Sequence, residues 1–129
     1  MKKKISCFAL TILMVLTIFS MSVCAENGNS TIFEYIVEFG NAQIVGIDES
    51  ASGDIVIPEN IERSFDNKIF TVKSIGVGAF SECFNLTSIE IPNTVTEICG
   101  RAFNECLRLT KFKIPSSVMT IANYAFYDC

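Results

Sequence analysis

The side chains with the most distinctive chemistry beyond residue 25 are four cysteines, Cys83, Cys99, Cys106 and Cys129. The chain contains no histidine, which removes the commonest general base, the commonest metal ligand and the usual activator of a nucleophilic Cys or Ser. The cysteines also lack the close C-x-x-C spacing that is typical of a structural zinc site. We therefore expect no catalytic site, no metal centre and no cofactor.

Three of the cysteines, Cys83, Cys106 and Cys129, follow one another at intervals of 23 residues, and only Cys99 is out of phase. Equal spacing favours a packing role, in which each Cys acts as a small buried hydrophobe. A disulfide between neighbours stays open as an alternative, because adjacent strands lie about 4.8 Å apart, within the Cα separation that a disulfide tolerates. We favour free, buried thiols.

The same interval governs the apolar residues from Ile75 to Cys129. A fixed period of this size indicates a solenoid of stacked units, so we predict repeats at 75–97 and 98–120 and a partial repeat at 121–129. The first copy carries Ile75, Ala79, Phe80, Cys83, Leu86, Ile89, Ile91, Pro92 and Val95.

The end of each repeat alternates like a strand. Ile89 and Ile91, and Phe112 and Ile114 in the next copy, are expected to point inward, and the proline that follows ends the strand. The segment 79–83 is too short for a full helix. We predict one short parallel strand per repeat, with short helical turns or loops on the opposite face.

Stacking brings the outward strand positions into two columns of candidate ligand-facing residues. Glu90 and Lys113 would be neighbours in one column, an opposite-charge pair worth about 0.2–1 kcal/mol. A solvated pair that fixes the strand register is favoured here over a ligand contact. The columns are Asp54, Ser88 and Lys111, and Val56, Glu90 and Lys113.

The repeat region is expected to span 51–129, with a degenerate first repeat at 55–58 and an insertion at 62–72 that contains a turn at 66–68. Before it, 31–39 and 42–47 are rich in β-branched and aromatic residues and read as a hairpin. Residues 26–50 therefore form a polar lead and a hairpin that caps the open end of the stack.

The N-terminus reads as a signal peptide at 1–25, since three lysines precede an apolar run that ends in Val23-Cys24-Ala25. An uncleaved membrane anchor and a lipoprotein modified at Cys24 are the alternatives. Without the three lysines the chain keeps 7 basic and 14 acidic residues, a net charge of 7 − 14 = −7. Such a charge disfavours nucleic acid, and we expect membrane contact only transiently, through the signal peptide.

The unit Ile-x-x-x-Ala-Phe-x-x-Cys-x-x-Leu-x-x-Ile-x-Ile-Pro-x-x-Val resembles the leucine-rich repeats of the BspA type, which occur in surface proteins of bacteria and some protists. The resemblance covers 55–129 with one insertion. It implies a right-handed leucine-rich-repeat solenoid that is exported and used for attachment to host or matrix proteins, or as a recognition region of a larger surface protein.

Our leading hypothesis is a non-catalytic protein-binding module that is secreted or located at the cell surface. Its expected partner is a host, matrix or cell-surface protein. The alternative is the recognition or targeting region of a larger secreted enzyme or surface protein truncated at Cys129. The pattern stops there in the middle of a repeat, so we expect further repeats or a following domain to pack beyond it.

Overall fold

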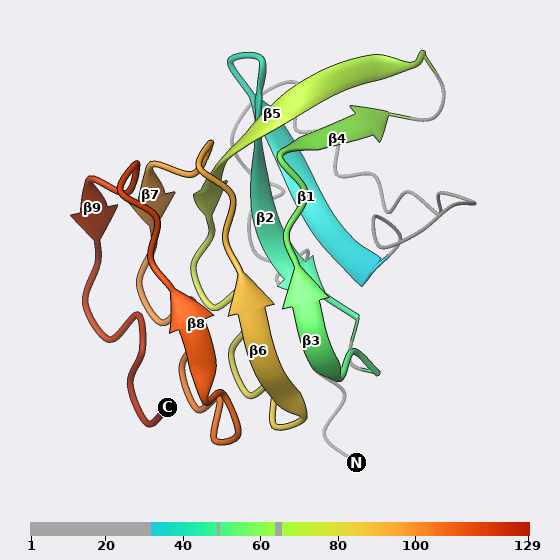
Figure 1. Cartoon of the computed structure of the whole chain (residues 1–129). Coiled ribbons are helices and arrows are strands. Elements are labelled where there is room, and N and C mark those ends of the chain that lie inside the picture. The colour runs from blue at the N-terminus through green and yellow to red at the C-terminus, as the bar shows by residue number, and fades with distance from the viewer. Residues whose placement is uncertain (1–31, 49, 64–65) are drawn as a thin grey trace, which may run out of the picture.

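A computed structural model describes residues 32–48, 50–63 and 66–129. The predicted signal peptide at 1–25 and the polar lead that follows it lie outside the described residues. The described part of the chain contains nine β-strands and no α-helix (Figure 1). They are β1 (Phe33–Glu38), β2 (Asn41–Ile47), β3 (Gly53–Val56), β4 (Asn60–Arg63), β5 (Lys68–Ile75), β6 (Leu86–Glu90), β7 (Glu97–Ile98), β8 (Lys111–Lys113) and β9 (Thr120–Ile121).

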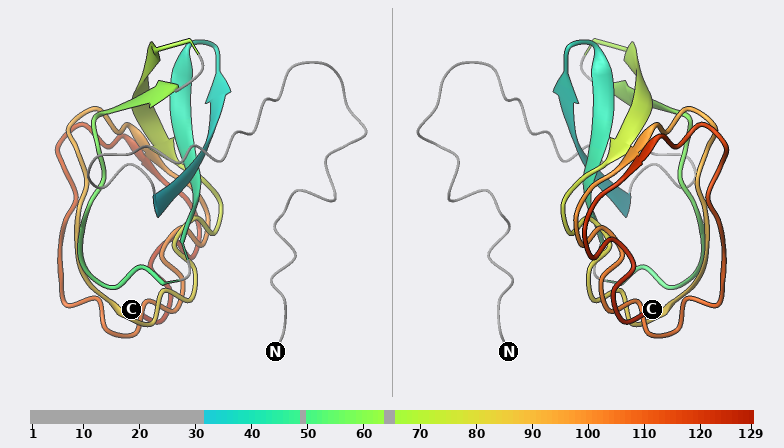
Figure 2. Two further views of the ribbon diagram at one scale, coloured as in Figure 1. Left: turned by 90° about the vertical axis from the view of Figure 1, so that its right-hand side faces the viewer. Right: turned by 90° about the vertical axis from the view of Figure 1, so that its left-hand side faces the viewer.

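Two sheets run along the stack. One has the order β3-β6-β8, and the other has the order β1-β2-β5-β7-β9, with β4 added beside β5. Each repeat places one parallel strand in each sheet: β6 and then β7, β8 and then β9. Figure 2 views the coils along the stack, where they superpose around a common interior. The prediction of one strand per repeat is therefore wrong, and the two-residue strands of the second sheet were missed.

The third side of each coil is made of turns, which agrees with the loop alternative of the prediction and not with a helical turn. Two positions per repeat, four residues apart, have a positive φ, which breaks a right-handed helix. Backbone hydrogen bonds between neighbouring coils stabilise this side. The Phe80 N–H donates to the Ala102 carbonyl and the Phe103 N–H donates to the Ala125 carbonyl, each at 2.7 Å. The positive-φ positions are Gly78, Arg101 and Tyr124 (64°, 56° and 60°), and Glu82, Glu105 and Asp128 (61°, 59° and 53°).

Identical side chains stack in the interior of the coil. The rings of Phe80 and Phe103 lie 4.9 Å apart between centroids, and those of Phe103 and Phe126 lie 5.2 Å apart. Ile89 and Ile91 are buried, as predicted. The core among the described residues contains no buried polar or charged residue.

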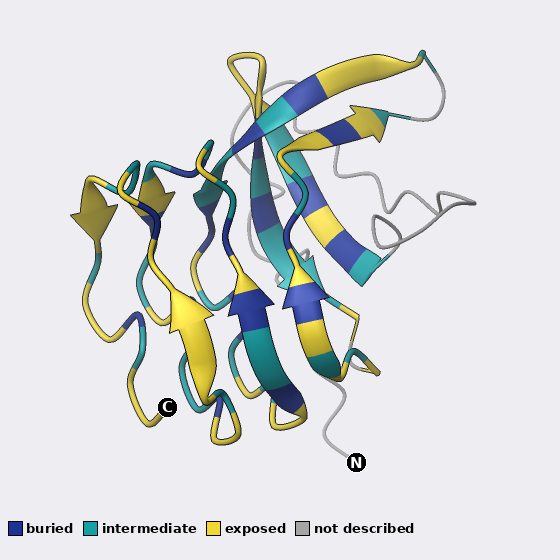
Figure 3. Ribbon diagram, viewed as in Figure 1, coloured by how far each residue is buried: buried dark blue, intermediate teal, exposed yellow. Residues whose placement is uncertain are grey.

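Phe112 and Ile114, which were expected to point inward, are less covered than Ile89 and Ile91, with 40% and 39% of their surface exposed. The reason is that β8 has a strand neighbour on one side alone within the described sheet, namely β6, and Figure 3 shows this end of the sheet as exposed. The Phe112 ring still stacks on Phe126, with centroids 4.6 Å apart.

Cys83, Cys99, Cys106 and Cys129 form no disulfide among the described residues. Cys106 is buried and its thiol donates to the Phe80 carbonyl at 3.1 Å, while Cys129 donates to the Phe103 carbonyl at 3.0 Å. The hydrogen-bonding contact with the Cys83 thiol, together with burial, raises the pKa of Cys106. The spacing thus places one thiol per repeat against the preceding coil. Burial was predicted for the whole column, but Cys129 is exposed and Cys83 is half-buried.

Two hairpins adjoin the repeats. Strands β1 and β2 pair antiparallel through a turn at Phe39-Gly40, one residue before the predicted Gly40-Asn41, and β2 then pairs parallel with β5. At the position of the predicted insertion, β4 and β5 also pair antiparallel, with Arg63 opposite Lys68.

Candidate functional site

The outer face of the β3-β6-β8 sheet gathers the six candidate residues into two rows. Asp54 lies beside Ser88, and Ser88 beside Lys111, in the strand register. The second row runs in the same register through Val56, Glu90 and Lys113. A ligand role for any of them stays a prediction, but their adjacency is a feature of the structure.

Strand alternation explains why these side chains face outward. Ile55 and Ile89 are buried in the core, so the residues on either side of each point away from it. The register between β3 and β6 shifts at Asp54, which leaves Thr87 without a strand partner on β3. Its hydroxyl donates to the Asp54 carboxylate at 3.0 Å. One candidate carboxylate is thereby oriented by a neighbouring strand.

Glu90 and Lys113 are neighbours in register, as predicted, yet their side chains form no ion pair within 4.0 Å among the described contacts. Both are exposed. In water, holding two long side chains together costs conformational entropy that an exposed ion pair barely offsets. The predicted opposite-charge contact is therefore absent, and both charges face solvent.

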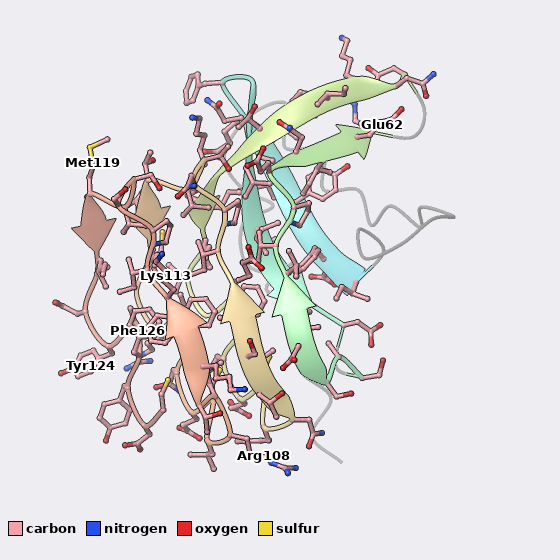
Figure 4. All side chains as sticks on the ribbon, in the orientation of Figure 1. Glu62, Arg108, Lys113, Met119, Tyr124 and Phe126 are labelled. Carbon is pink, nitrogen blue, oxygen red and sulfur yellow. The ribbon has the colours of Figure 1, made fainter. Side chains whose placement is uncertain are left out.

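Charge changes sign across this face. The acidic groups Asp54 and Glu90 belong to β3 and β6, whereas β8 carries Lys111 and Lys113. Figure 4 places Lys113 on β8 and Arg108 at the turn before it. Adjacent strands are about 4.8 Å apart, so the acidic and basic ends lie within about one Debye length at physiological salt. The face suits a partner with the opposite order of charge.

The chemistry available on this face is hydrogen bonding and ion pairing. Across the described ranges, no group of three or more His, Cys, Asp or Glu side chains is placed to hold a metal ion. Within the same ranges, no helix is long and apolar enough to cross a membrane.

A cleft that the sequence reasoning missed lies on the other sheet. Its volume is about 210 Å³, and its lining includes Glu38 and Phe39 from the first hairpin, Lys73 from β5 and Glu97 from β7. The residues come from three segments that are distant in the chain. The one local signal was a bulky Phe placed directly before a turn glycine.

Comparisons with known proteins agree with this architecture. A family model described as "BspA type Leucine rich repeat region (6 copies)" matches residues 62–129. No curated protein resembles the sequence closely enough to count as a match.

Three solved structures are similar. A leucine-rich cell surface protein of Faecalibacterium prausnitzii shares 28% identity over 84% of this chain, with a TM-score of 0.68. A leucine-rich repeat protein of Bacteroides ovatus shares 27% over 76%, with a TM-score of 0.63. One from Bacteroides capillosus shares 22% over 71% of this chain and 88% of its own, with a TM-score of 0.52, and supports the fold alone. The chain spans 30% and 32% of the length of the first two.

Proposed function

Because the chain belongs to the BspA-type leucine-rich repeat family, we propose that it is a non-catalytic module that binds another protein. The partner is a host, matrix or cell-surface component. One similar structure is itself described as a cell surface protein, which supports the same location for this chain.

The observation that carries the proposal is the outer face of β3, β6 and β8. Its rows expose acidic groups at one end and lysines at the other, and Val56 adds a 45% exposed apolar side chain. Complementary charge steers and orients a protein partner, and an apolar contact adds affinity. The face offers hydrogen bonds and charges without a constellation for catalysis.

Charge reversal on β8 tests this surface. The full chain and its Lys111→Glu/Lys113→Glu variant are compared for binding to immobilised matrix and host-cell surface proteins. We expect a partner whose affinity falls about tenfold or more in the variant, as for a hot spot. Arg101→Glu, on the turn side of the coil, is the matched control and keeps full affinity. A screen without any binder, or equal loss in both variants, contradicts the proposal.

One observation favours the alternative of a recognition region in a larger secreted enzyme or surface protein. The chain covers less than a third of the F. prausnitzii protein. That protein therefore contains a large region beyond the part that matches this chain. The open reading frame around these residues tests the alternative. A hydrolase or peptidase domain within that frame supports it, and further repeats alone contradict the enzyme version.

Export is proposed on the pattern of residues 1–25, which lie outside the described residues. The name of the F. prausnitzii protein supports a surface location. Mass spectrometry of the protein recovered outside its cell of origin tests this assignment. We expect the mature chain to begin at Glu26; an intact N-terminus contradicts cleavage.

We also propose that the hairpin within 26–50 caps the stack and that the repeats at 51–129 wind right-handed. Phe33 of β1 is buried and lies edge-on to Phe80, with centroids 6.3 Å apart, which supports a covering role for the hairpin. Parallel strands joined by crossovers are almost always right-handed. A crystal structure tests the hand, and Phe33→Ala is expected to lower the Tm far more than Phe39→Ala, at a fully exposed site.

A further inference from the structure

The presence of a phenylalanine at position 39, in the turn of the first hairpin, is not explained by a contribution to stability. Its side chain is fully exposed, and its φ is +49°, followed by +79° at Gly40. Two positive φ values in a two-residue loop are those of a type I′ turn, where Asn, Asp and Gly are favoured. Positive φ is uncommon for a bulky residue, and in this chain Tyr124 and Arg101 adopt it as well, in the turns of the repeats. The turn therefore holds Phe39 in an unfavourable backbone conformation, and its side chain packs into no core.

Phe39 is one of the residues that line a cleft of about 210 Å³. It is smaller than the roughly 300–1,000 Å³ of small-molecule pockets, so its size suits one or two side chains of a protein. Gln43, Ser74 and Glu97 line it from neighbouring register positions on β2, β5 and β7. The floor of the cleft is thus fixed by the sheet, while Phe39 lies at its rim.

Charge in the cleft favours a cation. Glu38 and Glu97 contribute two carboxylates against the single ammonium of Lys73, and the whole chain has a net charge of −4. An aromatic ring attracts a guanidinium or ammonium over its face, so Phe39 adds to the same preference. Together the groups suit a basic side chain next to an apolar one.

We propose that Phe39 and this cleft form a second protein-docking site, which takes an arginine or lysine flanked by an apolar residue of a partner protein. The proposal deepens the protein-binding function proposed above, but on a different sheet and with different residues. Backbone strain tends to persist where it serves a function, and buried aromatic anchors dominate interface energetics. On this view the strained turn holds the Phe39 ring ready for a partner.

Nuclear magnetic resonance titration of the full chain tests the docking site with two defined probes. The basic probe is acetyl-Ala-Arg-Phe-Arg-Ala-amide, and the acidic probe is acetyl-Ala-Glu-Phe-Glu-Ala-amide. We expect saturable shifts at Gly40, Gln43 and Ser74 with the basic probe alone. Absence of saturation, equal binding of the two probes, or shifts confined to other residues overturns the proposal.

Three variants refine the test. Phe39→Asn is expected to weaken the basic probe about tenfold while raising the Tm, because Asn suits the turn. Glu97→Gln should weaken it about threefold. Ile69→Asn removes another exposed apolar side chain, away from the cleft, and should leave the affinity unchanged. A Phe39→Asn variant with parental affinity overturns the proposal even if the protein is more stable.

The two proposed surfaces fail separately. If a screened partner depends on Lys111 and Lys113 while the basic probe does not saturate, the second site alone is wrong. If binding of the basic probe saturates and depends on Phe39 while the screen finds no partner, the proposed binding role of the β3-β6-β8 face is wrong.

Discussion

The ring of Phe103 stacks on that of Phe80 with 4.9 Å between centroids and 16° between ring planes, although 23 residues separate them in the chain. Both side chains are fully buried. Each ring therefore forms part of the surface against which the next coil packs. The solenoid is held together by contacts between equivalent residues, so a defect in one coil is felt in its neighbours.

Truncation of Phe103 is expected to destabilise the fold strongly. Phe103→Ala removes a fully buried ring and should lower the free energy of unfolding by about 3–5 kcal/mol. Urea denaturation followed by circular dichroism measures this. Phe84→Ala, at a residue 45% exposed, is the control and should cost less than about 1 kcal/mol. Phe103→Asp should not fold, since it buries an unpaired charge; similar losses in both alanine variants would falsify the proposed core.

Glycine at the left-handed turn positions is expected to stabilise the chain. Glu82 has a φ of +61°, a conformation that costs a side-chain-bearing residue about 1 kcal/mol, so Glu82→Gly should raise the unfolding free energy by up to about 1 kcal/mol. Gly78→Ala, with φ +64°, should lower it by a similar amount. Thermal melts give the sign of each change.

Val77→Gly is the control for the turn substitutions, because Val77 is exposed and is not among the positive-φ residues. It should destabilise by about 0.5–1 kcal/mol through the entropy of the unfolded chain. If Glu82→Gly destabilises like Val77→Gly, the left-handed geometry of this turn is wrong.

The interior could be predicted from the sequence because the identities of its residues repeat. Phe80 and Phe103 share a type and a spacing, which is enough to predict their contact. The second strand of each repeat was not predicted, because β7 and β9 have two residues each, which is too few to show an alternating pattern. The turns were misread because Arg101 and Glu105 adopt positive φ without glycine, and their residue types carry no signal of it.

The candidate surface was also predicted in part from the sequence. Periodicity alone predicted that Glu90 lies beside Lys113, and the register agrees, but it does not determine whether two solvated side chains meet. The cleft at Phe39 was beyond prediction, because it depends on how the first hairpin approaches Glu97, 58 positions along the chain. The repeat pattern predicts contacts between equivalent residues of the repeats. It does not predict contacts made by segments outside the repeats.

Cys106 is expected to resist alkylation in the folded chain. The thiolate is the reactive form, and contact with the Cys83 thiol and burial raise the pKa of Cys106. Iodoacetamide at pH 8, followed by peptide mass spectrometry, should modify Cys106 far more slowly than the exposed Cys129. In urea the two should react at equal rates. A fast native reaction at Cys106 contradicts the burial of its thiol.

The second hairpin should lose part of its stability in acid. Arg63 holds Asp66 through two hydrogen bonds of 2.9 and 2.6 Å, and this interaction lowers the pKa of Asp66 from 3.8 to about 2. A depressed folded-state pKa means that the native state favours the carboxylate. The contribution of Asp66 is therefore present in full above about pH 4 and is lost as the pH falls from 4 toward 2.

Comparison with Asp66→Asn isolates this contribution. The variant should be less stable than the parent at pH 7, and the difference should shrink between pH 4 and pH 2, measured by urea denaturation at each pH. Arg63 also lies over the Phe70 ring, 5.0 Å from its centroid, so its own removal changes packing as well as charge. In an Arg63→Gln background the effect of Asp66→Asn should depend on pH much less over this window, because the main cause of the lowered pKa is gone and only the weaker contributions of Lys68 remain. A pH dependence of parental size in that background would show that a group other than Arg63 is the main cause of the lowered pKa of Asp66.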